Sequence, residues 1–279
     1  MPRVLIAGCG YVGSATADLF HANGWTVEGW TASHESAHAL ASKPYPVRVV
    51  DLTETLRGDS DFNVVVQCAS TRGGDAAAYR RIYVEGARRV AEAFPNSLRI
   101  FTSSTSVYAQ RDGEWVTEES PAEPLHEKGR VLREAEEVVL HAHGIVGRVA
   151  GIYGPGRSAL LRKFLAGTAT CEDRFINQAH RDDIAAALWL LASSGKHGEI
   201  YNIADGHPIL QRAACAWLAE TLQRPTPPRP QHSAERKRGR SNKRVASDKL
   251  RALGWSPKYP DFAAAMSDSI LPNLAACGA

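Results

Sequence analysis

The stretch Val4-Leu5-Ile6-Ala7-Gly8-Cys9-Gly10-Tyr11-Val12-Gly13 decides the fold. Four consecutive apolar residues predict a buried strand, and the glycines that follow fit the pattern G-x-G-x-x-G at the start of a helix. Gly8 permits a tight turn, Gly10 lets a diphosphate approach the backbone, and Gly13 lets the helix pack closely against the strand. N–H groups at the start of the helix would then face the anion. The stretch therefore predicts a strand, a turn and a helix that together bind a dinucleotide.

Strand-like and helix-like segments alternate through the first half of the chain. Compact apolar runs of strand length lie at 4–7, 26–30, 47–50, 64–68 and 98–102. Segments with helical periodicity or good helix formers, such as 14–23 and 76–94, separate most of them. Strands that are buried on both faces and separated by helices indicate a parallel sheet. We therefore predict an α/β protein: a doubly wound parallel-sheet Rossmann domain with a smaller C-terminal substrate lobe.

The same alternation suggests where the two parts of the chain divide. Residues 1–150 are expected to form the dinucleotide-binding Rossmann domain, and residues 178–203 are expected to return to it. Residues 151–177 and 204–279 are expected to form the substrate lobe. Ligands of doubly wound sheets bind beyond the carboxyl ends of the strands, so we expect the lobe to cover that edge.

Composition excludes several classes of protein. The chain has 279 residues, 44% of them hydrophobic, and a net charge of +3, which gives no global case for a nucleic-acid or membrane partner. Its five cysteines are widely spaced and form no C-x-x-C pair, so neither a disulfide framework nor a metal site is expected. The longest later apolar run, 184–192, is too short to span a bilayer. A cytoplasmic protein is expected.

The end of the second strand bears on the choice of dinucleotide. It reads Trp30-Thr31-Ala32-Ser33, without the carboxylate that usually binds the ribose 2′-hydroxyl of NAD. Hydroxyls at Thr31 and Ser33 could instead bind a 2′-phosphate, although no arginine follows the strand. Glu28, inside the strand, is expected to face solvent. The sequence therefore favours NADP as the cofactor, with NAD as the alternative.

Further motifs follow one another in a characteristic order. They are Asp51-Leu52, Cys68-Ala69-Ser70, Val84-Glu85-Gly86, Phe101-Thr102-Ser103-Ser104-Thr105-Ser106-Val107-Tyr108, the segment 148–156, and His180-Arg181-Asp182-Asp183. Each motif alone is weak, but together with the glycine pattern the ordered set resembles the extended short-chain dehydrogenase/reductase family, the NAD-dependent epimerase/dehydratase group. The resemblance covers most of the chain and implies a nicotinamide dinucleotide cofactor.

The resemblance also implies roles for individual residues. Ser104 matches the catalytic serine or threonine, whose hydroxyl bonds to the reacting oxygen of the substrate. The residues expected to contact the cofactor are Gly8, Gly10, Tyr11, Val12, Gly13, Thr31, Ser33, Asp51, Leu52, Cys68, Ala69, Ser70, Ser103, Arg133 and Tyr153.

One family motif is missing. The catalytic Tyr-x-x-x-Lys pair occurs nowhere in the chain, and its expected positions hold Gly129 and Arg133. A glycine cannot donate a proton, and an arginine stays protonated. Tyr83, in a position where the family often has asparagine, is therefore a candidate catalytic residue beside Ser104 and Arg133, although a packed aromatic ring is the alternative. Two weaker candidates to replace the missing tyrosine are Tyr108 and His126. Tyr108 is expected to be a structural ring, and His126 is expected to be solvated.

Arginines dominate the predicted substrate side. The turn-forming segment Tyr153-Gly154-Pro155-Gly156-Arg157 ends a strand, so Tyr153 and Arg157 join Ser104 as candidate substrate contacts. Six of the nine residues from 236 to 244 are Lys or Arg. From this run, Arg238 and Arg244 are further candidates to bind an anionic group of the substrate. A solvated loop is the alternative for the run. No RNA-binding motif accompanies it, so no nucleic-acid partner is expected.

Three functions remain open at this point. The first is an NAD(P)-binding oxidoreductase or epimerase-like enzyme that acts on a small polar substrate, sugar-related or phosphorylated. The second is a dinucleotide-binding regulator or scaffold without turnover, and the third is a non-redox lyase or isomerase that uses the same pocket. The resemblance also implies a possible homodimer through the helices in 76–94 and 128–143, although their apolar stripes also suit packing onto the sheet.

Overall fold

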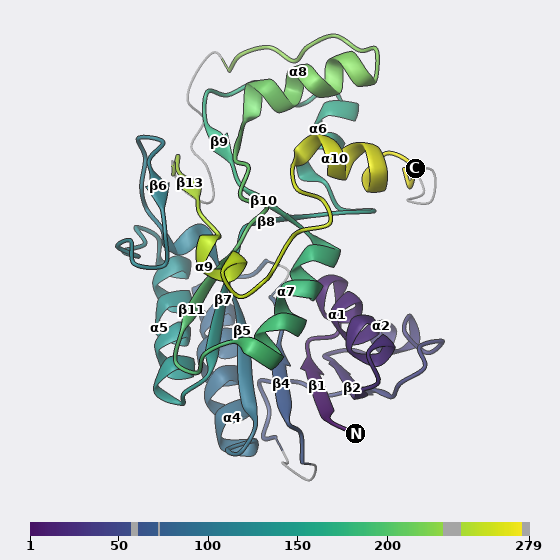
Figure 1. Cartoon of the computed structure of the whole chain (residues 1–279), viewed down its shortest axis with the longest axis vertical. Coiled ribbons are helices and arrows are strands. Elements are labelled where there is room, and N and C mark those ends of the chain that lie inside the picture. Colours follow the sequence, from purple (N-terminus) through teal and green to yellow (C-terminus); the bar gives the residue numbers. More distant parts are fainter. Residues whose placement is uncertain (57–60, 72, 231–240, 275–279) are drawn as a thin grey trace.

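A seven-stranded parallel sheet forms the centre of the protein (Figure 1). The computed structural model describes residues 1–56, 61–71, 73–230 and 241–274. The strands of this sheet are β1 (Arg3–Ala7), β2 (Thr26–Thr31), β3 (Val47–Val49), β4 (Val64–Gln67), β5 (Leu98–Ser104), β7 (Ile145–Val149) and β11 (Ile200–Ile203). They lie in the order β11-β7-β5-β4-β1-β2-β3. The chain winds outward in both directions from β1 and β4, which confirms the predicted doubly wound Rossmann fold and puts the switch point beside the glycine pattern.

Strand β1 shows why the sheet is buried on both faces. All four residues Val4, Leu5, Ile6 and Ala7 are fully buried. Val4 and Ile6 pack in one apolar cluster, whereas Leu5 and Ala7 pack in another. Because successive side chains of a strand point to opposite faces, an unbroken apolar run requires a covering layer on each side.

Helices supply those layers. Helix α1 (Tyr11–Ala22) packs against α7 (Arg181–Ser194), and the short α2 (His34–His38) follows β2. Helix α5 (Glu127–His141) packs against a continuous helical segment made of α3 (Ala76–Tyr79), the π-helical turn η1 (Arg80–Glu85) and α4 (Gly86–Ala93). A 3₁₀ turn, η2 (Thr105–Val107), continues from the end of β5.

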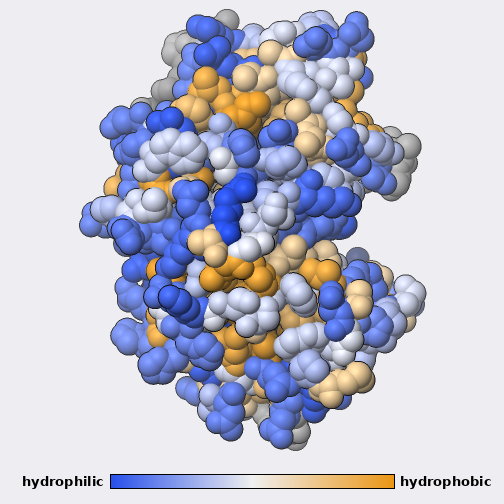
Figure 2. All heavy atoms as spheres, in the orientation of Figure 1, coloured by the Kyte–Doolittle hydropathy of each residue, from blue (hydrophilic) through white to orange (hydrophobic). Residues whose placement is uncertain are grey.

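A smaller lobe stands over the carboxyl ends of the strands, in the upper part of Figure 1. Its elements are β8 (Gly151–Tyr153), α6 (Ala159–Leu165), β9 (Phe175–Ile176), β10 (Gln178–His180), β12 (Ile209–Leu210), α8 (Gln211–Thr221), α10 (Phe262–Ala265) and the π-helical turn η3 (Met266–Ile270). Their side chains form an apolar cluster separate from those of the sheet, with Phe164, Leu218 and Phe262 among its buried members. The surface is hollowed between this lobe and the Rossmann domain (Figure 2).

Two segments cross between the parts of the molecule. Residues 178–203 carry β10, then α7 against α1, then β11 in the central sheet. Near the C-terminus, β13 (Arg244–Val245) pairs with β6 (Trp115–Val116), and α9 (Asp248–Arg251) follows it. Val245, Leu250 and Trp255 pack in the main apolar cluster, so this part of 204–279 lies against the Rossmann domain. Within the described part of the chain, the search for a helix that could cross a membrane finds none.

Candidate cofactor and catalytic site

The glycine loop has the geometry that a dinucleotide requires. Gly8 has a φ of +104°, and a Cβ atom there would lie 2.2 Å from the backbone nitrogen of Ala69. At Gly13 a Cβ would lie 2.2 Å from the carbonyl oxygen of Gly8. At Gly10, by contrast, a Cβ would meet nothing within 4 Å. The first and third glycines therefore pack the turn, and the second leaves an open approach to the backbone.

The open approach leads to the start of a helix. Gly10 is exposed and occupies the N-cap of α1, which runs for 12 residues. A glycine has no side chain to cover the first N–H groups, and the positive end of the helix dipole favours an anion there. A nicotinamide dinucleotide places its diphosphate at such a helix start. The residues present fit this group.

Tyr11 joins the glycine loop to the lobe. Its hydroxyl donates a hydrogen bond to the carbonyl oxygen of Pro155 at 2.8 Å. The guanidinium carbons of Arg157 and Arg181 lie 5.3 and 5.1 Å from the centre of its ring. Gly154 has a φ of +151°, and a Cβ there would lie 2.6 Å from the Tyr11 hydroxyl oxygen. The turn after β8 is thus fixed against the glycine loop, with two cations beside it.

The end of β2 differs from the expectation. The Thr31 hydroxyl donates to the carbonyl oxygen of Ser33 at 3.3 Å, and the Ser33 side chain caps α2 by accepting from Ser36 N. The prediction that Glu28 faces solvent is wrong. This side chain is buried, because it accepts a hydrogen bond from Trp30 Nε1 at 2.8 Å on the same face of the strand.

An arginine from the neighbouring strand lies beside Glu28. Arg48 on β3 pairs in register with Trp30, and its Nε lies 3.3 Å from Glu28 Oε1. About two thirds of the Arg48 side chain (65%) is exposed. A cation near the end of β2 could not be predicted from residues 30–33, because strand pairing, not the local sequence, brings it there.

The residues expected after β3 and β4 follow these strands as the motif requires. Asp51 is exposed, and its Oδ1 accepts from Thr53 N at 2.8 Å, whereas Leu52 is buried. Ala69 packs under Gly8, and Ser70 beyond it is exposed. Burial raises the pKa of the Cys68 thiol to about 12, so this side chain is neutral at physiological pH and is no nucleophile. Contact of these residues with a cofactor stays a prediction.

Ser103 and Ser104 at the end of β5 point in different directions. Ser104 is half-buried, and its hydroxyl oxygen caps η2 by accepting from Ser106 N at 3.2 Å. The buried Ser103 donates from its hydroxyl to Glu136 Oε1 at 2.5 Å. Because side chains alternate along a strand, Ser103 points toward α5, whereas the Ser104 hydroxyl lies on the other side, at the carboxyl edge of the sheet.

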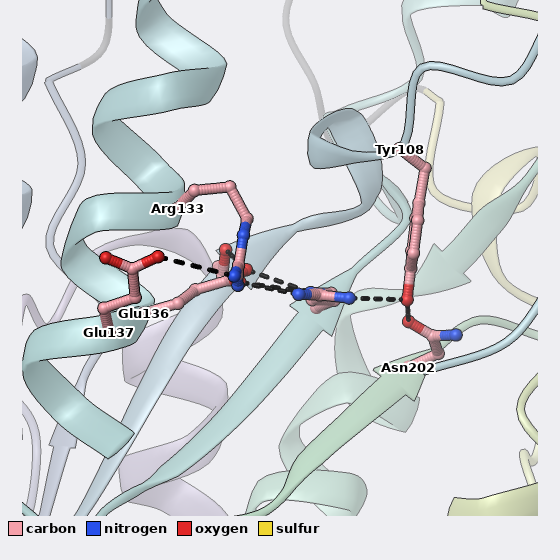
Figure 3. A network of polar contacts seen from close by, with 7 residues as sticks. Tyr108, Arg133, Glu136, Glu137 and Asn202 are labelled. Carbon is pink, nitrogen blue, oxygen red and sulfur yellow. Dashed lines mark hydrogen bonds and ion pairs between the residues drawn. The ribbon is translucent and has the colours of Figure 1, made fainter. Parts of the chain in front are cut away.

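A buried ion pair lies under this edge of the sheet (Figure 3). Glu136 on α5 and Arg148 on β7 are both almost completely buried, and Arg148 Nη2 donates to Glu136 Oε2 at 2.8 Å. Arg148 Nη1 also donates to the Tyr108 hydroxyl at 2.8 Å, and that hydroxyl donates to Asn202 Oδ1 at 2.9 Å. The network connects β5, α5, β7 and β11, and Tyr108 has the structural role expected of it.

Arg133 extends this network toward the surface (Figure 3). Its guanidinium forms ion pairs with Glu136 and with Glu137, the second at 3.6 Å. About a quarter of its side chain (26%) is exposed. Arg133 is thereby held by two carboxylates at the position where the family motif has lysine. Its contact with cofactor stays a prediction.

Position 129, where we expect the family motif to place its tyrosine, has no room for a side chain. Gly129 is buried in the first turn of α5, and a Cβ there would lie 2.5 Å from Cβ of Pro124. The loop that precedes α5 thus fills the beginning of the path that a tyrosine side chain would take. His126, at the N-cap of α5, is exposed and does not cap the helix.

Tyr83 is a packed aromatic residue. It lies in the π-helical turn η1 with only 9% of its surface exposed. Its ring centre lies 5.0 Å from that of Tyr79 and 6.2 Å from that of Phe101. These contacts fit the alternative expectation that Tyr83 is a packed aromatic ring. A catalytic role for Tyr83 stays a prediction.

The substrate candidates are spread over the lobe. Tyr153 is buried in the lobe cluster, and its hydroxyl donates to the carbonyl oxygen of Asp261 at 3.4 Å. Arg157 lies at the glycine loop, beside Tyr11. Arg244 lies between the rings of Trp115 and Phe175, 5.2 and 5.1 Å from their centres. Arg238 lies outside the described residues. The structure therefore separates Arg157 from Arg244, and substrate binding by these residues stays a prediction.

Acidic residues are buried where the lobe meets α7. Burial raises the pKa of Asp205 to about 8 and that of Asp183 to about 6, and Asp261 contributes to the rise at Asp205. Burial lowers the pKa of His180 to about 4; its Nε2 lies 3.0 Å from Ser269 Oγ, and its Nδ1 accepts from Asp182 N. Asp183 accepts from Lys258 N and Tyr259 N, so it ties the C-terminal segment to α7. These side chains are part of the packing between the lobe, α7 and the C-terminal segment.

Comparison with known proteins identifies the family of this chain. Residues 4–204 match the model of the NAD dependent epimerase/dehydratase family. Protein YeeZ of Escherichia coli K12 is 30% identical over 276 residues, 94% of this chain and 97% of that protein. The 4-hydroxy-2-methyl-3-oxo-4-farnesyl-3,4-dihydroquinoline-1-oxide ketoreductase of Stigmatella aurantiaca is 25% identical over 247 residues, 79% and 73% of the two chains. The structure of dTDP-glucose 4,6-dehydratase from Bacillus anthracis in complex with NAD has a TM-score of 0.81 at 17% identity, covering 97% and 96%. The chain belongs to the NAD-dependent epimerase/dehydratase family.

Proposed function

We propose that the protein is an NAD(P)-dependent oxidoreductase that acts on a hydroxyl or carbonyl group of a small molecule. The observation that carries this proposal is the glycine loop, where Gly8 and Gly13 close the turn and Gly10 leaves the helix start open. Ser104 is the last residue of β5. Only β4 separates β5 from β1 in this parallel sheet, so Ser104 and the glycine loop lie at the same edge of the sheet. A substrate held at this edge would have both a dinucleotide and a hydroxyl group beside it.

Ser104 is the proposed catalytic residue. A bound nicotinamide dinucleotide would supply or accept the hydride. The Ser104 hydroxyl would donate a hydrogen bond to the reacting oxygen, which gains negative charge as a carbonyl is reduced. Proton transfer to that oxygen has no tyrosine at position 129, so it would come from solvent or from Tyr83. Arg133, held by Glu136 and Glu137, would orient the ribose.

NADP is the proposed cofactor in preference to NAD. Residues 30–33 at the end of β2 include no carboxylate, and Glu28 is buried against Trp30. Arg48 adds a largely exposed cation beside the same strand end. A 2′-phosphate there would meet a positive rather than a negative side chain, which favours the phosphorylated dinucleotide.

A relative supports hydride transfer to a carbonyl. The protein from Stigmatella aurantiaca is named as a ketoreductase of a farnesylated quinoline oxide. We therefore propose reduction of a ketone as the first reaction to examine. The sequence alone favours a small polar substrate, sugar-related or phosphorylated. Compounds of this kind are the second set of candidate substrates to test, after simple ketones. A homodimer through α4 and α5 stays a prediction, which light scattering tests.

A second candidate function follows from one contact. Pro124 closes the position that a catalytic tyrosine would occupy, and this favours a dinucleotide-binding regulator without turnover. Both candidates require the cofactor. They differ in whether bound NADPH is oxidised by any carbonyl compound.

Fluorescence titration with NADPH and NADH tests the shared premise. We expect saturable binding, with NADPH the tighter ligand. Gly10→Ala should weaken binding at least about tenfold without loss of stability, because its Cβ would project into the open approach to the diphosphate. Gly24→Ala is the control for stability: its φ of +80° strains an alanine, so this variant should lose stability and keep its affinity for the dinucleotides. No binding of either dinucleotide at millimolar concentration would refute the proposal.

A further inference from the structure

A cavity of about 570 Å³ lies in the lobe, away from the glycine loop. Its lining includes Trp115, Phe175, Ile209, Leu210, Phe262 and Arg244. Apolar side chains gather on this face of the molecule near β9 and α8 (Figure 2). We call it the lobe cavity. Its volume lies within the range of about 300–1,000 Å³ that is typical of small-molecule sites.

Arg244 is the cation of the lobe cavity. Its guanidinium carbon lies between two aromatic rings, and its Nε donates to the carbonyl oxygen of Gly113 at 2.6 Å. These contacts fix the plane of the guanidinium. Within the described ranges, no carboxylate forms an ion pair with Arg244. A guanidinium held in this way can donate two parallel hydrogen bonds to an acidic group.

The walls of the lobe cavity indicate an apolar ligand. Trp115 is exposed over nearly half of its surface (48%), which is unusual for a large apolar side chain. Asp261 also lines the cavity, but its Oδ1 accepts from Ala264 N as the N-cap of α10. The other walls offer mainly aliphatic and aromatic groups. A sugar would find few hydrogen-bond partners on these walls, whereas an apolar ligand would remove apolar surface from water.

Two hydrogen bonds connect the segment that carries Arg244 to the catalytic edge. Lys243, next to Arg244, is buried and donates from Nζ to the carbonyl oxygen of Tyr108 at 3.0 Å. Tyr108 directly follows η2, the turn that Ser104 caps. Asn202, in β11, donates from Nδ2 to the carbonyl oxygen of Ala246 at 3.1 Å. The strand that carries Arg244 is therefore anchored to the same edge of the sheet as Ser104.

We propose that the lobe cavity binds the apolar or aromatic body of the substrate and that Arg244 binds an acidic oxygen group on it, such as a carboxylate or an enolate. This proposal rests on the proposed function, because it describes the substrate of that enzyme. It replaces the small polar substrate favoured by the sequence with an amphipathic one. Cofactor binding does not depend on it.

Two fluorescent probes that differ in one group test the proposal. 8-Anilinonaphthalene-1-sulfonate is an aromatic anion, and N-phenyl-1-naphthylamine has the same rings without the sulfonate. We expect both to bind at one site per chain. Arg244→Met should weaken binding of the anion at least about tenfold and that of the neutral probe less than threefold, since a charged hydrogen bond is lost and the apolar walls remain. Arg244→Lys, which keeps the charge without the planar fork, should give an intermediate loss for the anion.

A second pair of variants uses helix α8. Ala213 lines the lobe cavity, whereas Ala216 is exposed on the same helix and does not line it. Ala213→Trp should abolish binding of both probes by filling the cavity, and Ala216→Trp should leave both unchanged. Thermal unfolding of each variant shows that it is folded.

Each outcome has a definite consequence. Equal loss of both probes in Arg244→Met, unchanged binding in Ala213→Trp, or displacement of the anion by NADPH would overturn the proposal. NADPH titration of the same samples separates the two hypotheses. If NADPH binds and the probes do not, the proposed function stands and the substrate class is wrong. If the probes bind and NADPH does not, the proposed function fails first.

Discussion

A Cβ atom added to Gly129 would lie 2.5 Å from Cβ of Pro124. Side-chain atoms essentially never approach so closely, so the loop before α5 and the first turn of α5 are packed around a glycine. A tyrosine at position 129, where we expect the family motif to place one, would therefore require the loop before α5 to move as well.

Gly129→Ala is therefore expected to lower the free energy of unfolding by about 1–3 kcal/mol through overpacking, even though alanine is the better helix former. Urea unfolding measures the loss. Pro124→Gly removes the facing Cβ, so the double variant Pro124→Gly/Gly129→Ala should be more stable than the sum of the single losses predicts. Strict additivity would show that the two residues do not press on one another.

Gly129→Tyr with Arg133→Lys is expected to bring no gain in dehydrogenase activity over the wild type unless Pro124 is changed as well. The new tyrosine has no room, and Glu136 and Glu137 would hold the new lysine. NADPH oxidation with a panel of ketones compares the wild type and the double variant with the triple variant that adds Pro124→Gly. A gain in the double variant would show that the loop moves freely.

The ion pair between Glu136 and Arg148 gives a second prediction. Arg148→Met should lower the free energy of unfolding by about 3–5 kcal/mol, because it removes the buried partner of a completely buried carboxyl group and leaves that group only the partly exposed Arg133. Arg133→Met removes the outer arginine and should cost less than about 1 kcal/mol, since its pair is partly exposed. The combination Arg148→Met/Glu136→Leu should recover much of the loss. Equal losses for the two arginine variants would argue against this account.

Ser104 can be separated from its neighbour by function. Ser104→Ala should reduce any turnover about 100-fold, the typical effect of losing one donor to a developing oxyanion, while the affinity for NADPH changes little. Ser106→Ala is the control, because Ser106 contributes its backbone N–H to the cap and its side chain is exposed. Steady-state rates with the best ketone substrate measure both. An unchanged rate in Ser104→Ala would place the chemistry elsewhere.

Local patterns predict the fold and the cofactor loop. Val4 to Ala7 read as a strand buried on both faces, and each glycine after them has the role that its place in the motif implies. Both depend on residues within about ten positions of one another. The doubly wound topology of the central sheet followed from the same patterns.

Contacts between distant segments explain what the sequence could not predict. Glu28 is buried because Trp30 and Arg48 flank it, and Arg48 comes from a strand 18 residues away in a register that no local pattern encodes. Arg181 reaches Tyr11 only because α7 packs against α1. Arg133, expected to face the cofactor, is held by a glutamate whose burial depends on Arg148. Ion pairs across elements carry no periodicity in the sequence.

Stability is expected to fall as the pH rises from about 6.5 to 8. Burial raises the pKa of Asp205 to about 8, with Asp261 and Asp183 adding to the rise and Arg251 opposing it. An aspartate in the unfolded chain titrates near about 4. Between these values the folded state holds a proton that the unfolded state has released, so raising the pH favours unfolding by up to about 1.4 kcal/mol per pH unit.

This pH window isolates Asp205 from the other buried groups. The pKa of Asp183 is raised to about 6, so its ionisation lowers stability mainly as the pH rises toward 6, below the range used here. His180, whose pKa is lowered to about 4, acts in the opposite direction below about 6.5, because the unfolded histidine is then the form that holds the proton. Lys243, whose pKa is lowered to about 8, adds stability only as the pH rises above that value.

Asp205→Asn tests the assignment. An asparagine carries no charge at any pH, and its Oδ1 can still accept the hydrogen bond that Asp205 Oδ1 accepts from His207 N at 3.0 Å. Urea unfolding at pH 6.5, 7.0, 7.5 and 8.0 should show a decline in the free energy of unfolding for the wild type and a nearly flat profile for the variant. Asp248→Asn, in the short helix α9, is the control for loss of one carboxylate and should retain the decline. If the free energy of unfolding declined equally with pH in the wild type and in Asp205→Asn, Asp205 would already be ionised in the folded protein. Another group would then have to lose the proton that causes the decline.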